Sequence, residues 1–256
     1  MFGNNTYWWA GWLIFLLFAS LNAVIFLLRN NPRISYIIAY AVAAYLLIYK
    51  TGELIWLKPW DNNYRFPVEL SALSYCLFGI FVVFRIHKFD SFPVFVALLS
   101  GIIYSVYFCL VPDCYIRDMD TPFSLSMSIV NHHALYFGAM LLISNVRRFP
   151  IHHIWQQIAG VALLTGYAWV IYIFTDYHTV MGKPIIIQIS DSSILGWLFQ
   201  IQKFQIWHKI VYYVFVFFTV GSILAMFYLL NHKMSDRRKR KGLPASYFPS
   251  SGKDAD

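Results

Sequence analysis

The stretch YWWAGWLIFLLFASLNAVIFLLR, residues 7–29, decides the fold class, because no charged side chain occurs in it before Arg29. A helix rises ~1.5 Å per residue, so a run of this length crosses the ~30 Å hydrocarbon core of a bilayer. The run follows no basic segment and is longer than the apolar part of a signal peptide. It therefore predicts a transmembrane helix.

The rest of the chain has the same character. Of its 256 residues 59% are hydrophobic and 12% are charged, whereas soluble domains carry about 25% charged residues. Runs long enough to span a bilayer occur at about 7–29, 35–57, 66–86, 92–112, 123–146, 153–176 and 208–231. The sequence therefore predicts an all-α polytopic membrane protein, with a seven-helix bundle over residues 1–234 and a basic, flexible tail over residues 235–256.

Lysine and arginine residues in the short loops predict the orientation of this bundle. They follow the first, third, fifth and seventh runs, as Arg29, Arg33, Arg85, Lys88, Arg147, Arg148, Lys233 and the basic stretch 237–241. The loops on the other side carry fewer basic residues and several aspartates. We expect the N-terminus outside and the C-terminus in the cytoplasm of a multi-pass protein, in the plasma (cytoplasmic) membrane.

The net charge of +8 comes mostly from these loops and the tail. Basic residues next to a membrane helix set topology and contact anionic headgroups, so membrane lipids are the expected partners and nucleic acid is not. The three cysteines lack metal-site spacing, and no paired ligands occur at helical spacing. Neither a metal nor another cofactor is expected.

Polar residues inside the apolar runs are the candidate functional residues, because charged groups in hydrocarbon are costly and face the bundle interior. SIVNHHALYFGAM, residues 128–140, carries Asn131, His132 and His133, which lie ~12–15 Å below the outer end of their helix. Further polar groups near the same side of the membrane are Lys50, Glu53, Glu69, Ser71, Asp176, Tyr177 and Lys183.

This convergence predicts an intramembrane pocket that opens to the extracytoplasmic side. At most one of the two histidines points at the bundle centre, because consecutive residues lie ~100° apart on a helix. Asn131 and Tyr136 are candidate partners of the imidazoles. Lys50 and Glu53, spaced i, i+3, are expected to form a structural ion pair. The segment 177–207 is expected along the outer interface or folded partly back into the bundle, and in either place it could form a lid.

Two stretches carry a family resemblance: GELIWLKPWDNNYRFPVELSALSYCLFGI, residues 52–80, and FTDYHTVMGKP, residues 174–184. Together with the histidines of residues 131–133 they resemble the YwaF-like seven-helix membrane proteins, bacterial relatives of an animal transmembrane acyltransferase. That family has a glutamate late in helix 2, a Pro-Leu-His-Leu-Cys start to helix 3, a histidine in helix 5 and a Lys-Pro after helix 6.

The resemblance implies a phospholipid acyltransferase or acyl hydrolase, with Ser71 as nucleophile, His133 or His132 as base and Glu69 to orient the imidazole. Ser71 replaces the family's cysteine and Glu69 its histidine, and a serine depends on its base more than a cysteine does. Cys76 is an alternative nucleophile. The competing hypothesis is a non-catalytic binding or transport subunit that holds a lipid or small solute and contacts a membrane-protein partner.

Overall fold

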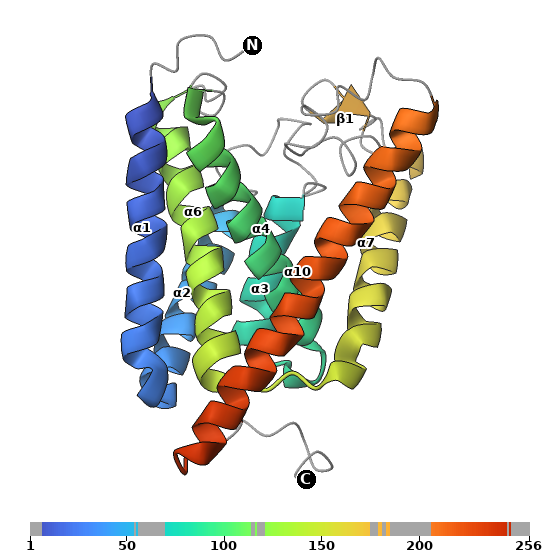
Figure 1. Ribbon diagram of the computed structural model, residues 1–256. Helices are drawn as coiled ribbons and strands as arrows, with labels where there is room; N and C mark the ends of the chain where they lie inside the picture. The colour runs from blue at the N-terminus through green and yellow to red at the C-terminus, as the bar shows by residue number, and fades with distance from the viewer. Residues whose placement is uncertain are drawn as a thin grey trace.

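The computed structural model describes residues 7–53, 55, 70–113, 116, 121–174, 179–180, 183–184, 206–244 and 246. Its long helices are α1 (Trp8–Leu27), α2 (Pro32–Gly52), α3 (Leu70–Val83), α4 (Ser91–Leu110), α6 (Pro122–Leu141), α7 (Ile154–Phe174) and α10 (Ile206–Arg240). They run alternately up and down through the molecule (Figure 1). Each expected apolar run therefore falls on a helix.

Short elements connect some of these helices. The 3₁₀ helices are η1 (Leu28–Asn30), η3 (His87–Phe89) and η5 (Ile151–His153), and η4 (Leu142–Val146) is a π-helix that continues α6. Strands β1 (Thr179–Val180) and β2 (Lys183–Pro184), of two residues each, pair in an antiparallel hairpin. The expected all-α architecture is confirmed in the described part of the chain, apart from this hairpin.

Four helical segments are long and apolar enough to cross a membrane. They are Trp8–Asn30, Pro32–Gly52, Ser91–Leu110 and Pro122–Val146, and Ser71–Val83 is a shorter apolar helix. On α1, bulky apolar side chains such as Trp12 and Leu16 are exposed on the protein surface. A surface of this kind is stable in lipid but costly in water. The helices therefore fit a membrane-embedded protein.

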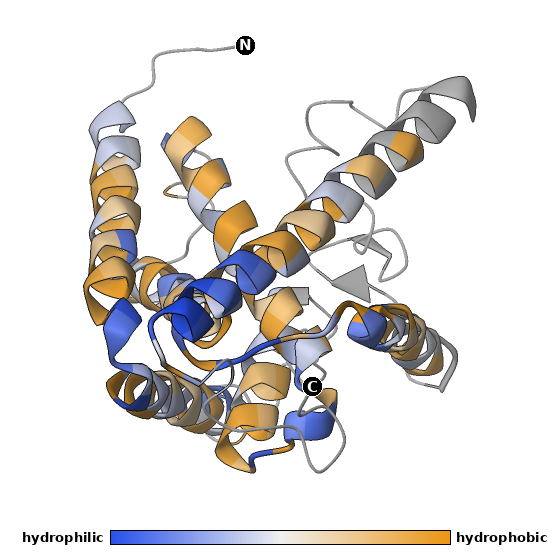
Figure 2. Cartoon of the chain, turned by 60° about the horizontal axis from the view of Figure 1, so that its bottom comes forward, coloured by the Kyte–Doolittle hydropathy of each residue, from blue (hydrophilic) through white to orange (hydrophobic). Residues whose placement is uncertain are grey.

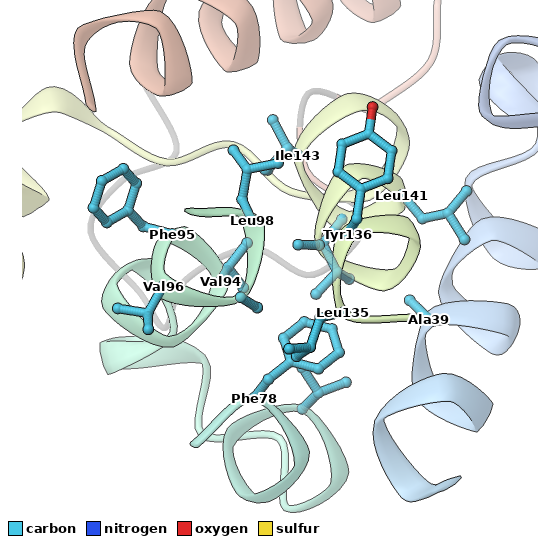
Figure 3. Close-up of a cluster of buried hydrophobic side chains, with 14 of the residues drawn as sticks. Ala39, Phe78, Val94, Phe95, Val96, Leu98, Leu135, Tyr136, Leu141 and Ile143 are labelled. Carbon is cyan, nitrogen blue, oxygen red and sulfur yellow. The ribbon is translucent and has the colours of Figure 1, made fainter. Parts of the chain in front are cut away.

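The core lies where α2, α3, α4 and α6 meet. Ala39, Phe78, Val94, Leu98 and Leu135 are buried in one continuous cluster of apolar side chains, and Figure 3 shows them between the four helices. Small residues allow the close contacts between these helices, as is usual in membrane bundles.

At Gly101, α4 comes very close to α6. A Cβ at this position would lie 2.6 Å from the Cβ of Tyr136 and 2.9 Å from the carbonyl oxygen of His132. Real Cβ atoms do not tolerate such distances, so a glycine is needed where the two backbones meet. This contact holds the histidine segment of α6 directly against α4.

One end of the bundle carries most of the basic residues, and we call it the basic end. The ends of α1, α6 and α10 lie there, at the bottom of Figure 1. Arg29 follows α1, Arg147 follows the π-helix that continues α6, and residues 237–240 end α10. Figure 2 views the molecule with this end forward and shows the hydrophilic C-terminal part of α10.

Helix α10 extends further than the sequence predicted. The expected span ends at residue 231 and the expected flexible tail begins at residue 235, whereas the helix continues to Arg240. The prediction that residues 235–240 are flexible is wrong, because Ser235 and Arg238 are buried against the bundle. Gly242 ends the helix with a positive φ of 71°, and the Leu243 amide donates to the Arg238 carbonyl at 3.0 Å, as in a Schellman motif.

Candidate functional site

The three consecutive polar residues of α6, at positions 131–133, contact three different helices. Asn131 is buried, and its Oδ1 accepts a hydrogen bond of 2.8 Å from the Tyr45 hydroxyl on α2. His132 contacts α3, and His133 contacts α4. Successive residues on a helix diverge by ~100°, so three in a row reach three neighbours. These side chains link four helices of the bundle.

His132 is held on both of its ring nitrogens. Its Nδ1 donates to the Ser128 carbonyl at 2.8 Å, which leaves Nε2 as the acceptor of a neutral ring. The Tyr75 hydroxyl lies near both ring nitrogens, 3.0 Å from Nδ1 and 3.2 Å from Nε2. The ring also stacks face to face on Tyr104 of α4, with centroids 3.9 Å apart and planes inclined by 10°. His132 is therefore fixed in one orientation.

His133 lies beside a hydroxyl of α4. Its Nδ1 donates to the Ile129 carbonyl at 2.8 Å, and its Nε2 lies 3.4 Å from the Ser105 Oγ. Both side chains are buried, and the Ser105 hydroxyl also donates to the Gly101 carbonyl at 2.8 Å. Rotation of this hydroxyl would direct its hydrogen to the free lone pair of Nε2. The pair has the arrangement of a nucleophile beside an oriented base.

Ser71, the predicted nucleophile, is not the serine that lies beside a histidine in the structure. It lies in the first turn of α3, partly exposed, and its carbonyl accepts from the Ser74 hydroxyl at 2.6 Å. The hydrogen bonds described for the two imidazoles go to Tyr75 and Ser105 and to carbonyls of α6. Cys76, the alternative nucleophile, is a free, partly buried thiol on α3.

Several predicted site residues lie outside the described part of the chain. These are Glu69, Asp176 and Tyr177. The backbone of Lys183 is described and pairs with Val180 in the β hairpin. The predicted roles of these residues remain predictions.

Lys50 and Glu53 form the ion pair that their spacing predicts. The Lys50 Nζ lies 2.5 Å from the Glu53 Oε2, and the two side chains are 8% and 18% exposed. A lysine this deeply buried needs an opposite charge at hydrogen-bonding distance. The pair therefore neutralises two charges at the end of α2.

Tyr136, predicted as a partner of the imidazoles, turns instead toward α1. Its hydroxyl donates to the Asn22 Oδ1 at 2.6 Å, and its ring lies 4.4 Å from that of Phe18. The contact explains Asn22, the single amide within the apolar run of α1. It ties α1 to α6 in the middle of the bundle.

A second polar network, at the basic end, was missed by sequence reasoning. Asn231 of α10 donates to the carbonyls of Ile143 and Arg147 at 2.7 and 2.8 Å and accepts from the Phe149 amide at 2.7 Å. Arg238 donates to the carbonyls of Ser144 and Arg147. The π-helix and the turn after it expose these carbonyls, and α10 satisfies them.

Beside this network lies a cavity of about 340 Å³ between the ends of α1, α6 and α10. Its wall combines the basic side chains of Arg29, Arg237, Arg238 and Lys241 with apolar ones such as Phe26. The residues of the pocket that the sequence predicts, such as Lys50 and Ser71, do not line this cavity, so it is a different site. The signal in the sequence is the basic stretch at the end of α10, which alone predicts topology and headgroup contacts but no cavity.

Within the described residues, no group of three histidine, cysteine or acidic side chains is close enough to hold a metal ion. The chain matches no protein-family model, and neither a curated protein nor a solved structure is significantly similar to it. The resemblance to YwaF-like proteins stays a prediction from short motifs, and function has to be argued from the site itself.

Proposed function

We propose that the chain is a seven-span protein of the plasma membrane, with its N-terminus outside and its basic end in the cytoplasm. A helix lies at each of the seven apolar runs. The basic residues of several loops gather at one end, as the positive-inside rule requires. Labelling of single cysteines placed after Arg33 and before Trp8 with a membrane-impermeant reagent tests the orientation. Only the position before Trp8 should react in intact cells.

We further propose that it is a non-catalytic binding or transport subunit for a membrane lipid, working with a membrane-protein partner. The cavity at the basic end carries this proposal, because its wall combines cationic and apolar side chains and so matches an amphiphile. Of the buried polar groups of α6, by contrast, Asn131 and His132 contact Tyr45 and Tyr75 of neighbouring helices, and His133 donates to a carbonyl of its own helix.

Mass spectrometry of the intact protein released from detergent tests this function. The wild type should carry a bound lipid. Met140→Trp, which fills the cavity from α6, should lose it. Met226→Trp is the matched control, because Met226 is exposed on α10, and it should keep the lipid. A wild type without any bound lipid, or equal retention by both variants, would contradict the proposal.

One observation favours acyl transfer as a second candidate: Ser105 lies 3.4 Å from His133 Nε2. In that reaction the Ser105 Oγ would attack an ester carbonyl of a phospholipid while Nε2 accepts the hydroxyl proton. The ester C–O bond would then break, and the imidazolium would return the proton to the leaving alkoxide. A second alcohol would take the acyl group from the serine by the reverse steps.

Lipid mass spectrometry of reconstituted protein with a deuterated acyl donor tests this candidate. It predicts that label transfer is lost in Ser105→Ala and His133→Ala. Ser100→Ala on the same helix is the control and should transfer label like the wild type. Loss in Ser71→Ala alone would instead support the nucleophile expected from the family resemblance. Absence of label transfer by the wild type would rule out both nucleophiles.

A further inference from the structure

The basic side chains around the cavity come from two ends of the chain. Arg29 belongs to η1, which follows α1, and Arg237, Arg238 and Lys241 belong to the end of α10. The residues that line the cavity include no aspartate or glutamate. Four positive charges thus surround one space without an acidic side chain among them.

Arg238 has a structural role that accounts for its charge. It is buried, and its guanidinium donates to the carbonyls of Ser144 and Arg147, at the end of α6 and η4. Cations are stabilised at helix C-termini in this way. Burial lowers the pKa of Arg238 to about 10, which leaves it charged near neutral pH.

The other three cations, Arg29, Arg237 and Lys241, do not bind the carbonyls at the end of a helix as Arg238 does. The Arg29 guanidinium lies over the Phe26 ring, 3.7 Å from its centroid, and the Lys241 Nζ donates to the Asn30 Oδ1 at 2.9 Å. Arg237 is exposed at the rim. The acid beside it in the sequence, Asp236, lies 3.3 Å from His232. Among the described side chains, no carboxylate pairs with these three cations.

The cavity also has an apolar side. Ile25 lines it about one turn before Arg29, and Leu230 lines it about two turns before Arg237 on α10; Met140 adds an apolar side chain from α6. Along the chain of α1 and of α10, the apolar lining therefore lies toward the middle of the bundle and the cations toward its end. A cavity graded from apolar to cationic matches a molecule with a hydrocarbon chain and an anionic head.

We propose that this cavity binds the phosphate headgroup of an anionic phospholipid from the cytoplasmic leaflet. Arg29, Arg237 and Lys241 contact the phosphate, and the acyl chain lies along the apolar side. Basic pockets at membrane helix ends recognise anionic lipids through charge-assisted hydrogen bonds to phosphate. The inference rests on the proposed function, and it adds the ligand's charge, its headgroup chemistry and its leaflet.

Binding of short-chain lipids to the purified full-length protein tests the inference, with thermal unfolding in a neutral detergent as readout. The compared probes are dioctanoyl phosphatidylglycerol, dioctanoyl phosphatidylcholine and inorganic phosphate. Phosphatidylglycerol should bind at least tenfold more tightly than either of the others. The variant Arg29→Gln/Arg237→Gln should lose about tenfold or more of that affinity, whereas Arg33→Gln, an exposed site at the same end outside the cavity, should stay within twofold.

The outcomes separate this inference from the proposed function. Equal binding of phosphatidylcholine would overturn the inference and leave a lipid-binding protein. Equal binding of inorganic phosphate would overturn it in favour of a soluble anion. Equal affinity of the double variant and the wild type for phosphatidylglycerol would also overturn it, because the lipid would then lie elsewhere. Absence of lipid binding in every arm would contradict the proposed function as well.

Discussion

Replacement of Asn231 by leucine should be strongly destabilising, although leucine has a similar size and suits an apolar helix. Asn231 is fully buried on α10, with 0% of its surface exposed. Its amide makes hydrogen bonds to the carbonyls of Ile143 and Arg147 and to the amide of Phe149. A leucine at this position can make none of them.

The expected loss follows from the number and setting of these bonds. Hydrogen bonds between membrane helices contribute ~0.6 kcal/mol each on average and ~1.7 at most, so three bonds give about 2 kcal/mol. The Arg147 carbonyl keeps its bond to Arg238, whereas the Phe149 amide loses the partner described for it. An unsatisfied buried donor costs about 1–3 kcal/mol. We therefore expect a total loss of about 3–5 kcal/mol.

Reversible unfolding in mixed detergent measures this loss as a change in the free energy of unfolding. His232→Leu is the control, because the next residue of α10 is exposed and its contact with Asp236 lies on the surface. Surface ion pairs contribute little, so the control should change stability by less than about 0.5 kcal/mol. A loss below about 0.5 kcal/mol in Asn231→Leu would refute the role of this residue in holding α10 on the bundle.

Three further substitutions test other contacts. Gly101→Ala should lower the free energy of unfolding by about 1–3 kcal/mol, because its Cβ would lie 2.6 Å from a facing Cβ on α6. Gly166→Ala is the control and should not lower it, because open space surrounds Gly166. Equal effects of the two variants would contradict the close approach. Lys50→Met should lower the free energy of unfolding by about 3 kcal/mol, because it leaves the Glu53 charge without a partner. Lys50→Met/Glu53→Gln should lower it less in the same assay. Additive losses would argue against the ion pair. Gly242→Ala should cost about 1 kcal/mol at its positive φ and speed amide hydrogen exchange over residues 238–243; unchanged exchange would argue against the C-cap.

Apolar run length was sufficient to place the helices. Segments 35–57 and 92–112 correspond to α2 (Pro32–Gly52) and α4 (Ser91–Leu110) within a few residues, because a bilayer requires a continuous helix of fixed minimum length. Hydropathy failed at the end of α10. Residues 235–240 are too polar to count as a span, and contacts of Ser235 and Arg238 with the bundle keep them helical.

The site was predicted less well than the helices. The i, i+3 spacing of Lys50 and Glu53 was enough to predict their ion pair, since helix geometry alone brings them together. The residue facing His133 could not be predicted in this way. Ser71 and Ser105 are both serines in apolar runs, and only the close approach of α4 to α6 at Gly101 places Ser105 beside the imidazole.

By itself the sequence determined that the chain is helical and suited to a membrane, where its helices lie apart from the extension of α10, and that one end is basic. Those properties depend on each segment alone, on its length, its apolar content and its charge. Tertiary structure decided which polar groups meet: Asn131, His132 and His133 reach three separate helices, and Arg29 joins Arg237 at one cavity. Contacts between helices depend on their rotation and crossing, and these are set by the packing of small and large side chains across the whole bundle.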